Sequence, residues 1–348
     1  TPYYWDKTLG LNARATSFAS QTSASDAPTV TRIIMMSTAD RHAVCLGCNP
    51  ISETAQDLLQ IRWSDQEDPF NWTPSATNTA GGKRLSSGSE IVAAVKTRQE
   101  ILIWTDMNLH AMRFVGPDDV FSFALVASNV SIIGLNAAVA VGDKAFWMDR
   151  DNFYVYAGRL QVVPCTVLRY IFDDINLDQS YKFFAASNST FDEVIWFYAS
   201  ASSSEIDRYA KFNYTEGAWD IGTLARTAWV DHGIHTNPRA SGSASAVEYV
   251  YIQESGDNDD GSAMSSYIES GDFDLGDGEQ FMFIERLIPD VALVDTSTGS
   301  TGSVDYVLKT RNYPGDSLTT NSTNTVNGTT QQSFVRSRSR QAVIRVES

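Results

Sequence analysis

Short apolar runs separated by polar turns dominate the chain. Stretches rich in Val, Ile, Phe, Tyr and Trp alternate with clusters of Gly, Asn, Asp and Ser, which is typical of β-strands joined by turns. No window of about a dozen residues sustains an apolar stripe at helical spacing. The pattern therefore predicts an all-β chain.

One phrase occurs more than once. "EILIWTDMNLHAMRFVG" (100–116) and "KAFWMDRDNFYVYAG" (144–158) each hold an apolar run with a Trp, an Asp two positions later, a polar turn and a second apolar run. Residues 90–126, 134–168 and 182–222 each predict four strands, with Trp104, Trp147 and Trp196 on the second strand. A looser unit upstream carries Trp63, and one downstream, from Pro238, keeps the strands but lacks a Trp.

A four-stranded antiparallel unit that recurs about every 40 to 50 residues is typical of a β-propeller blade. We therefore predict an all-β fold, a β-propeller built from four-stranded antiparallel blades with long polar loops. A β-sandwich or tandem sandwiches is the open alternative. The four Trp side chains are expected to fill the space between blades. The Asp after each Trp is expected to accept backbone N–H bonds and close the hairpin.

The pattern also suggests how the chain is organised. Residues 1–40 are expected to form an N-terminal arm and closing strand, 41–290 the propeller blades, and 291–348 a loop-rich β region completing the last blade. The uncharged stretch 120–141 has about the length of a membrane helix, but Asn129, Gly134 and Asn136 divide it into β-branched pieces. We interpret it as two strands and a turn, and predict no membrane-spanning segment.

Charge and cysteine content narrow the class of protein. Asp and Glu outnumber Lys and Arg by 42 to 26, a net charge of −16, which should repel nucleic acid in general. Cys45, Cys48 and Cys165 are too few and odd in number for a disulfide framework. They suit assembly in a reducing cytosol.

Three clusters of residues could form a metal site or an active site, and each also has a simpler structural interpretation. His42, Cys45 and Cys48 lack a second ligand pair for zinc and fit a core strand. "HGIH" (232–235) lacks the Glu of a metalloprotease helix. "GDNDDGS" (256–262) fits a hairpin turn, with a weak calcium site as the alternative. We expect no catalytic residues, no metal and no cofactor.

A short basic stretch near the C-terminus is different. "FVRSRSRQAVIR" places Arg336, Arg338 and Arg340, here called the arginine strip, on one face of a strand. The strip either binds an acidic partner or a phosphate backbone, or is a solvated strand face. Its candidate partners are carboxylates of a neighbouring subunit: Asp257, Asp259 and Asp260.

An ordered series of motifs resembles a known family. "RWSDQEDPFNW", "GSEIVAAVKTRQEILIWTD", "IIGLNA", "VPCTV", "YIFDDINLDQS", "KFNYTEGAW", "RTAWVDHG" and "RSRQAVIRVES" together resemble virion proteins of short-tailed double-stranded DNA bacteriophages, known as tail-hub, tail-nozzle or packaged-DNA-stabilisation proteins. The resemblance runs from about Tyr3 to Ser348, in the same order. No single motif is decisive.

The resemblance implies a function and a set of partners. It implies a β-propeller core, no catalytic residues, and a homo-hexameric ring at the portal vertex of the virion, assembled in the host cytoplasm. Portal and adaptor proteins would lie above the ring and tail fibre, needle or spike proteins below it. Double-stranded DNA would pass through without sequence-specific binding. The alternative function is a glycan-binding or glycan-cleaving propeller module of a viral tail.

Overall fold

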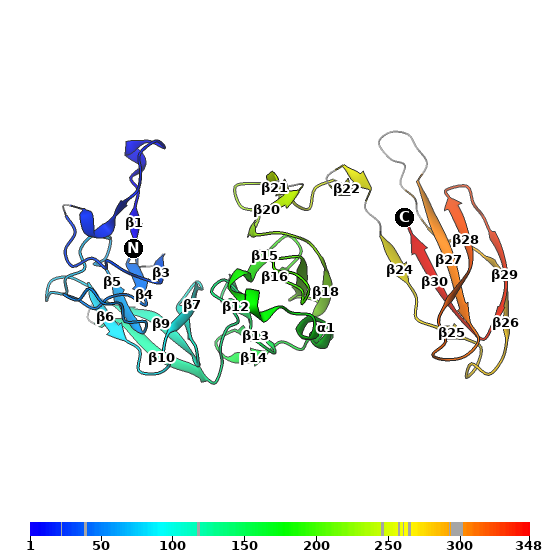
Figure 1. The fold of residues 1–348 in the computed structure, drawn as a ribbon, viewed down its shortest axis with the longest axis horizontal. Coiled ribbons are helices and arrows are strands. Elements are labelled where there is room, and N and C mark those ends of the chain that lie inside the picture. Colours follow the sequence, from blue (N-terminus) through cyan, green and yellow to red (C-terminus); the bar gives the residue numbers. More distant parts are fainter. Residues whose placement is uncertain are drawn as a thin grey trace. The chain divides into compact units, whose positions relative to one another are not determined.

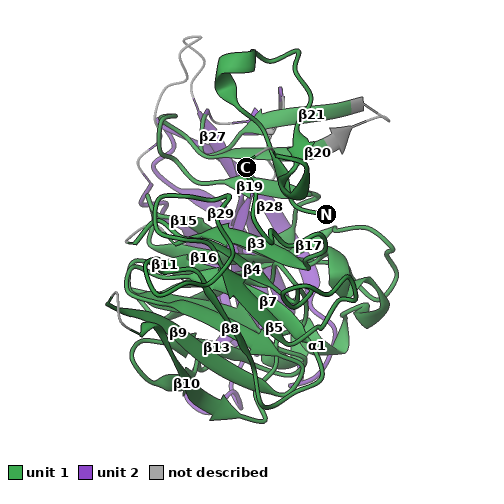
Figure 2. Cartoon of the chain, turned by 90° about the vertical axis from the view of Figure 1, so that its left-hand side faces the viewer, with its two compact units in different colours: residues 1–255 green, residues 256–348 purple. Residues whose placement is uncertain are grey.

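The computed structural model describes residues 1–21, 23–37, 40–116, 119–244, 247–256, 258–259, 261–263, 266–291, 293 and 302–348. Within these residues the chain is nearly all-β, as the apolar pattern predicted (Figure 1). It divides into two compact units, residues 1–255 and residues 256–348 (Figure 2).

Three four-stranded antiparallel sheets of unit 1 follow the predicted units strand for strand. In each, consecutive strands pair with one another, so the chain meanders across the sheet. The second sheet contains β7 (Ile91–Lys96), β8 (Ile101–Thr105), β9 (Asn108–Gly116) and β10 (Val120–Ser128). The third contains β11 (Ala138–Val141), β12 (Lys144–Met148), β13 (Phe153–Tyr156) and β14 (Leu160–Val162). The fourth contains β15 (Phe184–Asn188), β16 (Glu193–Tyr198), β17 (Arg208–Asn213) and β18 (Ala218–Thr223).

The first sheet differs from the prediction in one strand. It contains β3 (Ile33–Met36), β4 (Ala43–Leu46), β5 (Gln60–Trp63) and β6 (Gly81–Arg84), in that order. Because β3 precedes the first strand that the sequence indicated, Trp63 lies on the third strand rather than the second. The predicted arm, 1–40, thus contributes a strand to a sheet.

The last sheet of unit 1 begins earlier than expected. It contains β19 (Ala228–Val230), β20 (Arg239–Ala244) and β21 (Val247–Ile252). The predicted unit starts at Pro238 and contains no Trp. The structure adds β19 upstream, and β19 carries Trp229.

Short elements complete unit 1. They are β1 (Tyr3–Tyr4), β2 (Thr16–Ser17), the 3₁₀ turns η1 (Lys7–Leu9), η2 (Phe18–Ser20) and η3 (Leu177–Lys182), and the helix α1 (Leu168–Asp173). In the described part of the chain, no helix combines the length and the apolar character needed to cross a membrane. The uncharged stretch 120–141 forms β10 and β11, as predicted, in two successive sheets.

The sheets of unit 1 pack in the manner of propeller blades. From the second sheet onward, the first strand of each sheet lies against the first strand of the next: β7 against β11, β11 against β15, and β15 against β19. The largest buried cluster runs through the second, third and fourth sheets and contains Trp104, Trp147 and Trp196. A second cluster joins the first sheet to the second and contains Trp63.

A Trp side chain contributes to each junction between successive sheets. The ring centroids of the contacting pairs are 4.7 to 5.9 Å apart, in tilted or edge-to-face arrangements that aromatic rings prefer. The pairs are Trp63–Phe121 at 5.2 Å, Trp104–Trp147 at 5.1 Å, Phe153–Trp196 at 4.7 Å and Phe197–Trp229 at 5.9 Å.

Unit 2 has two antiparallel sheets and its own core. One sheet contains β24 (Tyr267–Glu269), β25 (Phe273–Asp274), β27 (Ser303–Arg311), β28 (Thr319–Asn327) and β30 (Gln341–Glu347). The other pairs β26 (Met282–Leu287) with β29 (Ser333–Ser339), and a short pair joins β22 (Asn258–Asp259) to β23 (Ser262–Ala263). The core of unit 2 contains one buried side chain from each of four strands: Met282 of β26, Leu308 of β27, Val335 of β29 and Ala342 of β30.

The division between the units lies within the range predicted as propeller core, 41–290. Strands β24, β25 and β26 of that range pair with β29 and β30, which belong to the predicted C-terminal region, 291–348. The strand expected just before them, "AVEYVYIQESG", instead pairs as β21 with β20 in unit 1.

Truncation of Trp196 should destabilise unit 1 strongly. Its side chain is 1% exposed, so Trp196→Ala leaves a cavity between the third and fourth sheets and should cost about 3–5 kcal/mol of unfolding free energy. Trp5→Ala is the matched control, because Trp5 is 40% exposed. Urea unfolding followed by far-ultraviolet circular dichroism measures both, and equal losses would contradict the assigned role.

Candidate functional site

The repeated phrase places a Trp and an Asp two residues apart, at or just beyond the end of a strand. Successive side chains of a strand alternate between its faces, so residues at this spacing project on the same side. The pairs are Trp63 with Asp65, Trp104 with Asp106, Trp147 with Asp149 and Trp229 with Asp231.

In the third sheet, Trp147 and Asp149 together hold Ser131. The indole Nε1 of Trp147 donates to the Ser131 carbonyl oxygen at 3.1 Å. Asp149 accepts the Ser131 backbone N–H at 3.2 Å and its hydroxyl at 2.6 Å. Two side chains therefore satisfy the backbone donor, the backbone acceptor and the hydroxyl of one serine, and fix the connection that leads into β11. We call this arrangement the Trp–Asp clamp.

The first sheet repeats the clamp around a threonine. Trp63 Nε1 donates to the Thr79 carbonyl oxygen at 2.9 Å. Asp65 accepts the Thr79 backbone N–H at 2.9 Å and its hydroxyl at 2.8 Å. Burial raises the pKa of Asp65, but the hydrogen bonds from Thr79 outweigh burial, and the pKa lies below its ordinary value.

At the junction of the fourth sheet with β19, the clamp crosses from one sheet to the next. Trp229 Nε1 donates to the Ser187 carbonyl oxygen at 2.9 Å, and Asp231 accepts the Ser187 hydroxyl at 2.9 Å. Asp231 also accepts the backbone N–H of Ser189. This pair was not among the predicted ones, although "WVD" (229–231) repeats the spacing of "WSD", "WTD" and "WMD".

The second sheet has half of the clamp. Asp106 accepts the backbone N–H and the hydroxyl of Ser89, each at 2.7 Å, and the backbone bond is the larger cause that lowers the pKa of Asp106. Among the described residues, the indole N–H of Trp104 has no hydrogen-bond partner. In the fourth sheet, Tyr198 stands where the Asp would be, and Trp196 Nε1 donates across to the Ala137 carbonyl oxygen of the third sheet at 3.2 Å.

The predicted role of the Asp needs correction. We expected each carboxylate to close the hairpin that follows its strand. Asp149 does accept the adjacent backbone N–H of Arg150 at 2.8 Å. The other bonds of Asp106 reach Ser89 and Glu90, and the remaining bonds of Asp149 reach Ser131; all three residues precede the first strand of the same sheet.

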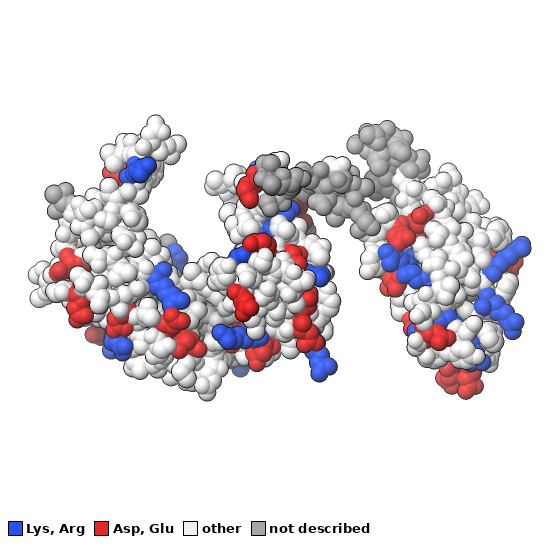
Figure 3. Space-filling view, in the orientation of Figure 1, with Lys and Arg blue, Asp and Glu red and all other residues white. Residues whose placement is uncertain are grey.

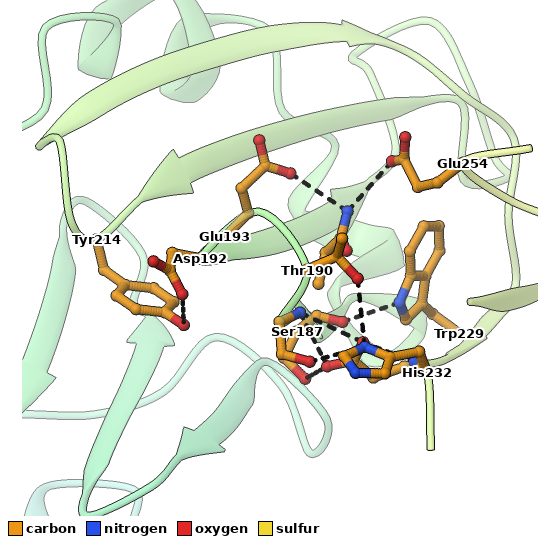
Figure 4. Close-up of polar contacts among 11 residues, drawn as sticks. Ser187, Thr190, Asp192, Glu193, Tyr214, Trp229, His232 and Glu254 are labelled. Carbon is orange, nitrogen blue, oxygen red and sulfur yellow. Dashed lines mark hydrogen bonds and ion pairs between the residues drawn. The ribbon is translucent and has the colours of Figure 1, made fainter. Parts of the chain in front are cut away.

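A polar cluster of unit 1 surrounds the turn between β15 and β16 (Figure 4). His232 Nδ1 lies 3.0 Å from the Ser189 hydroxyl, 3.3 Å from the Thr190 hydroxyl and 3.3 Å from Asp231 Oδ1. In a Ser–His–Asp triad, the serine and the aspartate bond to opposite nitrogens of the imidazole. Here both contact the same nitrogen, so the geometry does not suit nucleophilic catalysis.

The other side of this turn brings two carboxylates to one amide. Asn188 is buried, and its Nδ2 donates to Glu254 Oε1 at 3.1 Å and to Glu193 Oε2 at 3.4 Å (Figure 4). Glu193 also pairs with Lys211 at 3.0 Å. The Lys211 ammonium offsets the charge of Glu193, and the Asn188 amide donates to both carboxylates, so the two glutamates do not form a free acid pair.

The residues considered for zinc lie in a core. His42 is fully buried, with Nδ1 3.2 Å from Asp40 Oδ2 and Nε2 3.0 Å from the Thr79 hydroxyl. Burial raises the pKa of the Cys45 thiol, and raises that of Cys48 to about 12, so both stay protonated. Across the described ranges, His, Cys, Asp and Glu do not gather in a group of three or more that could hold a metal ion.

The arginine strip lies on and just beyond β29. Arg336 and Arg338 are exposed, while Val335, Ser337 and Ser339 between them face the core. Arg340 follows the strand and is half-buried. Of the predicted acidic partners, Asp257 and Asp260 lie outside the described residues, and Asp259 ends β22.

Comparison with known proteins adds little to this description. No family model matches the chain, and no curated protein matches it. A chain in the solved S. cerevisiae complex of a Dbp5 variant bound to Nup159, a Gle1 variant, IP6 and ADP is similar over 66% of this chain and 75% of that one, at 8% sequence identity and a TM-score of 0.29. A likeness of this size carries no argument about fold or function.

Loss of one clamp carboxylate should destabilise unit 1. Asp149→Ala leaves the backbone N–H and hydroxyl of Ser131 without their acceptor and should cost about 2 kcal/mol of unfolding free energy. Asp151→Ala, an exposed residue of the same turn, is the matched control and should change stability by less than about 0.5 kcal/mol. Urea unfolding compares the two, and a neutral Asp149→Ala would remove the clamp from the account of stability.

Stability should fall in two steps on acidification. Burial lowers the pKa values of His42 and His110 below 6.5. The unfolded chain therefore takes up protons first, and this stability, complete above 6.5, is lost as pH falls through the folded-state values. The lowered pKa values of Asp65, Asp106 and Asp231 give stability that is complete above 3.8 and lost below it. Urea midpoints from about pH 8 to about pH 3 test both steps; a flat profile above about pH 5 would contradict the histidine step.

Proposed function

We propose that this chain is a non-enzymatic virion structural protein, a subunit of the tail hub or nozzle of a short-tailed double-stranded DNA bacteriophage. In this proposal, six copies form a ring that continues the channel of the portal and adaptor. The ring retains packaged DNA and lets it pass during ejection. Tail fibre, needle or spike proteins attach below it.

One observation carries the proposal: the polar residues of the repeated phrase are engaged in building the sheets. The Trp–Asp clamps hold Ser131, Thr79 and Ser187. The carboxylates of the clamps accept hydrogen bonds from backbone N–H and hydroxyl groups. Repetition of a phrase for this purpose fits a rigid scaffold. The ordered series of motifs that resembles phage tail proteins then supplies the kind of scaffold.

The charge of the chain supports a role as a DNA conduit. The net charge is −16, and on the face of each unit that Figure 3 shows, Asp and Glu side chains lie among Lys and Arg side chains. Negative walls repel phosphates, so a polyanion can slide past without being bound. A surface that gripped DNA would slow ejection.

Localisation in the particle tests the proposal. Phage particles are assembled with a C-terminally tagged copy of the chain, decorated with a tag-specific antibody fragment, and imaged by electron cryomicroscopy. We expect added density in a ring directly below the portal, at a single vertex. Particles that lack the tag provide the background image.

Other positions of the label would contradict the proposal in distinct ways. Density over the whole capsid would make the chain a surface protein of the head. Density only at the distal end of the tail, together with binding of the purified chain to host glycans, would favour the glycan-binding module.

A further inference from the structure

The arginine strip differs from the other cations of unit 2. Lys309, Arg311 and Arg345 each pair with a carboxylate, and Arg286 bonds to the Gln332 amide. Within the described residues, Arg336, Arg338 and Arg340 have neither a carboxylate nor a hydrogen-bond partner for their guanidinium groups. Three adjacent arginines repel one another, and an acidic partner would relieve that repulsion.

Aromatic rings hold two of the three guanidinium groups in place. Arg338 lies 4.7 Å and Arg340 5.1 Å from the ring centroid of Phe281, and Arg340 lies 5.3 Å from that of Tyr313. The Nε of Arg340 is buried without a partner in the described structure. Stacking of this kind orders the arginines before any partner arrives, which lowers the entropic cost of binding.

The same face exposes large apolar side chains. The pairing of β26 with β29 sets Phe283 opposite Arg338 and Arg286 opposite Phe334. Phe283 is 64% exposed and Phe334 57% exposed. Beside them the register shifts, and Arg336 has a φ of 48°, which is uncommon for a residue other than glycine. Shifts of this kind re-aim side chains at functional edges of sheets.

Arginine with exposed aromatic residues, and no lysine, is the composition of a protein–protein interface. We infer that the face formed by β26, β29 and the arginine strip binds the acidic surface of a second copy of this chain. This choice of occupant rests on the proposed ring. A copy supplies the complementary charge, because its Asp and Glu exceed its Lys and Arg by 16. Nucleic acid would meet the arginines only against the repulsion of that same excess.

The contact joins two different surfaces of the subunit, one basic and aromatic, the other acidic. A contact between unlike surfaces can continue from copy to copy around a ring, whereas a contact between like surfaces stops at a dimer. The high net charge of each copy opposes such association. Added salt therefore has two opposite effects: it screens the repulsion between the copies, and it weakens the attraction between the arginine strip and the acidic surface. The apolar part of the face is what keeps the contact from depending on charge alone.

Photochemical cross-linking of the purified full chain tests the inference. Phe283 is replaced by p-benzoyl-phenylalanine, and copies with light and heavy isotopes are mixed and illuminated. We expect a product of twice the chain mass that contains light–heavy peptide pairs. The triple variant R336E/R338E/R340E should reduce its yield about tenfold. The conservative variant R336K/R338K/R340K, which keeps the charge but loses the planar stacking group, should retain part of it.

A matched control separates the face from net charge. Arg14, Arg150 and Arg169 are exposed, and among the described residues of unit 1 their guanidinium groups have no carboxylate partner. R14E/R150E/R169E changes the charge by the same amount and should leave the cross-link yield unchanged. Circular dichroism confirms that each variant is folded.

Each other outcome overturns the inference. No product of twice the chain mass, or equal loss in both triple variants, would show that the face does not bind a second copy. A product formed only with added single- or double-stranded DNA would make the face a nucleic-acid site. These results are independent of localisation: a ring label without the cross-link rejects only the face, and the cross-link without a ring label rejects only the proposed function.

Discussion

A four-stranded sheet with two apolar faces cannot bury both of them alone, and in unit 1 successive sheets bury apolar faces against one another. The Trp side chains make this possible, because an indole is large enough to span the gap between neighbouring sheets. Trp104 and Trp147 meet directly, and Trp196 reaches Phe153 of the preceding sheet. The order of the sheets, the adjacency of their first strands and the continuous core all follow from this packing.

Burial of the indoles creates a second requirement, because each also carries an N–H group that needs an acceptor. The clamp meets it by using the carbonyl of a Ser or Thr whose remaining polar groups are taken by the nearby Asp. Ser131 is held in this way on three sides. The Trp, which packs between sheets and donates its N–H, and the Asp, which accepts hydrogen bonds, lie only two residues apart. One short repeated phrase therefore provides both the packing and the hydrogen bonds. That economy accounts for its repetition.

The sequence predicted local features well and distant ones poorly. The strands of the second, third and fourth sheets were evident from apolar runs and turn residues, because hairpins join neighbours in the chain. The clamp partners were not evident, since Ser131 lies 18 residues before Asp149 and no pattern links them. Trp229 was missed because β19 is only three residues long.

The pairing of β30 with β24 joins residues about eighty positions apart, such as Tyr267 and Glu347, a separation at which apolar pattern carries no pairing information. The arginine strip was visible, but its aromatic neighbours Phe281 and Tyr313 come from other segments.

The two units use their cations differently, and the difference bears on how a subunit with this charge could assemble. In unit 1, Arg62 is fully buried and bonds within the unit: it donates to the carbonyl oxygens of Asp26, Asn49 and Trp72. In unit 2, Arg338 and Arg340 of the arginine strip lie against aromatic rings and have no acidic partner among the described residues. An acidic chain gains solubility from its net charge but loses the capacity to approach its own copies. We infer that the ordered arginines beside exposed Phe residues offset that repulsion at one face of unit 2, because they can pair with the acidic surface of another copy.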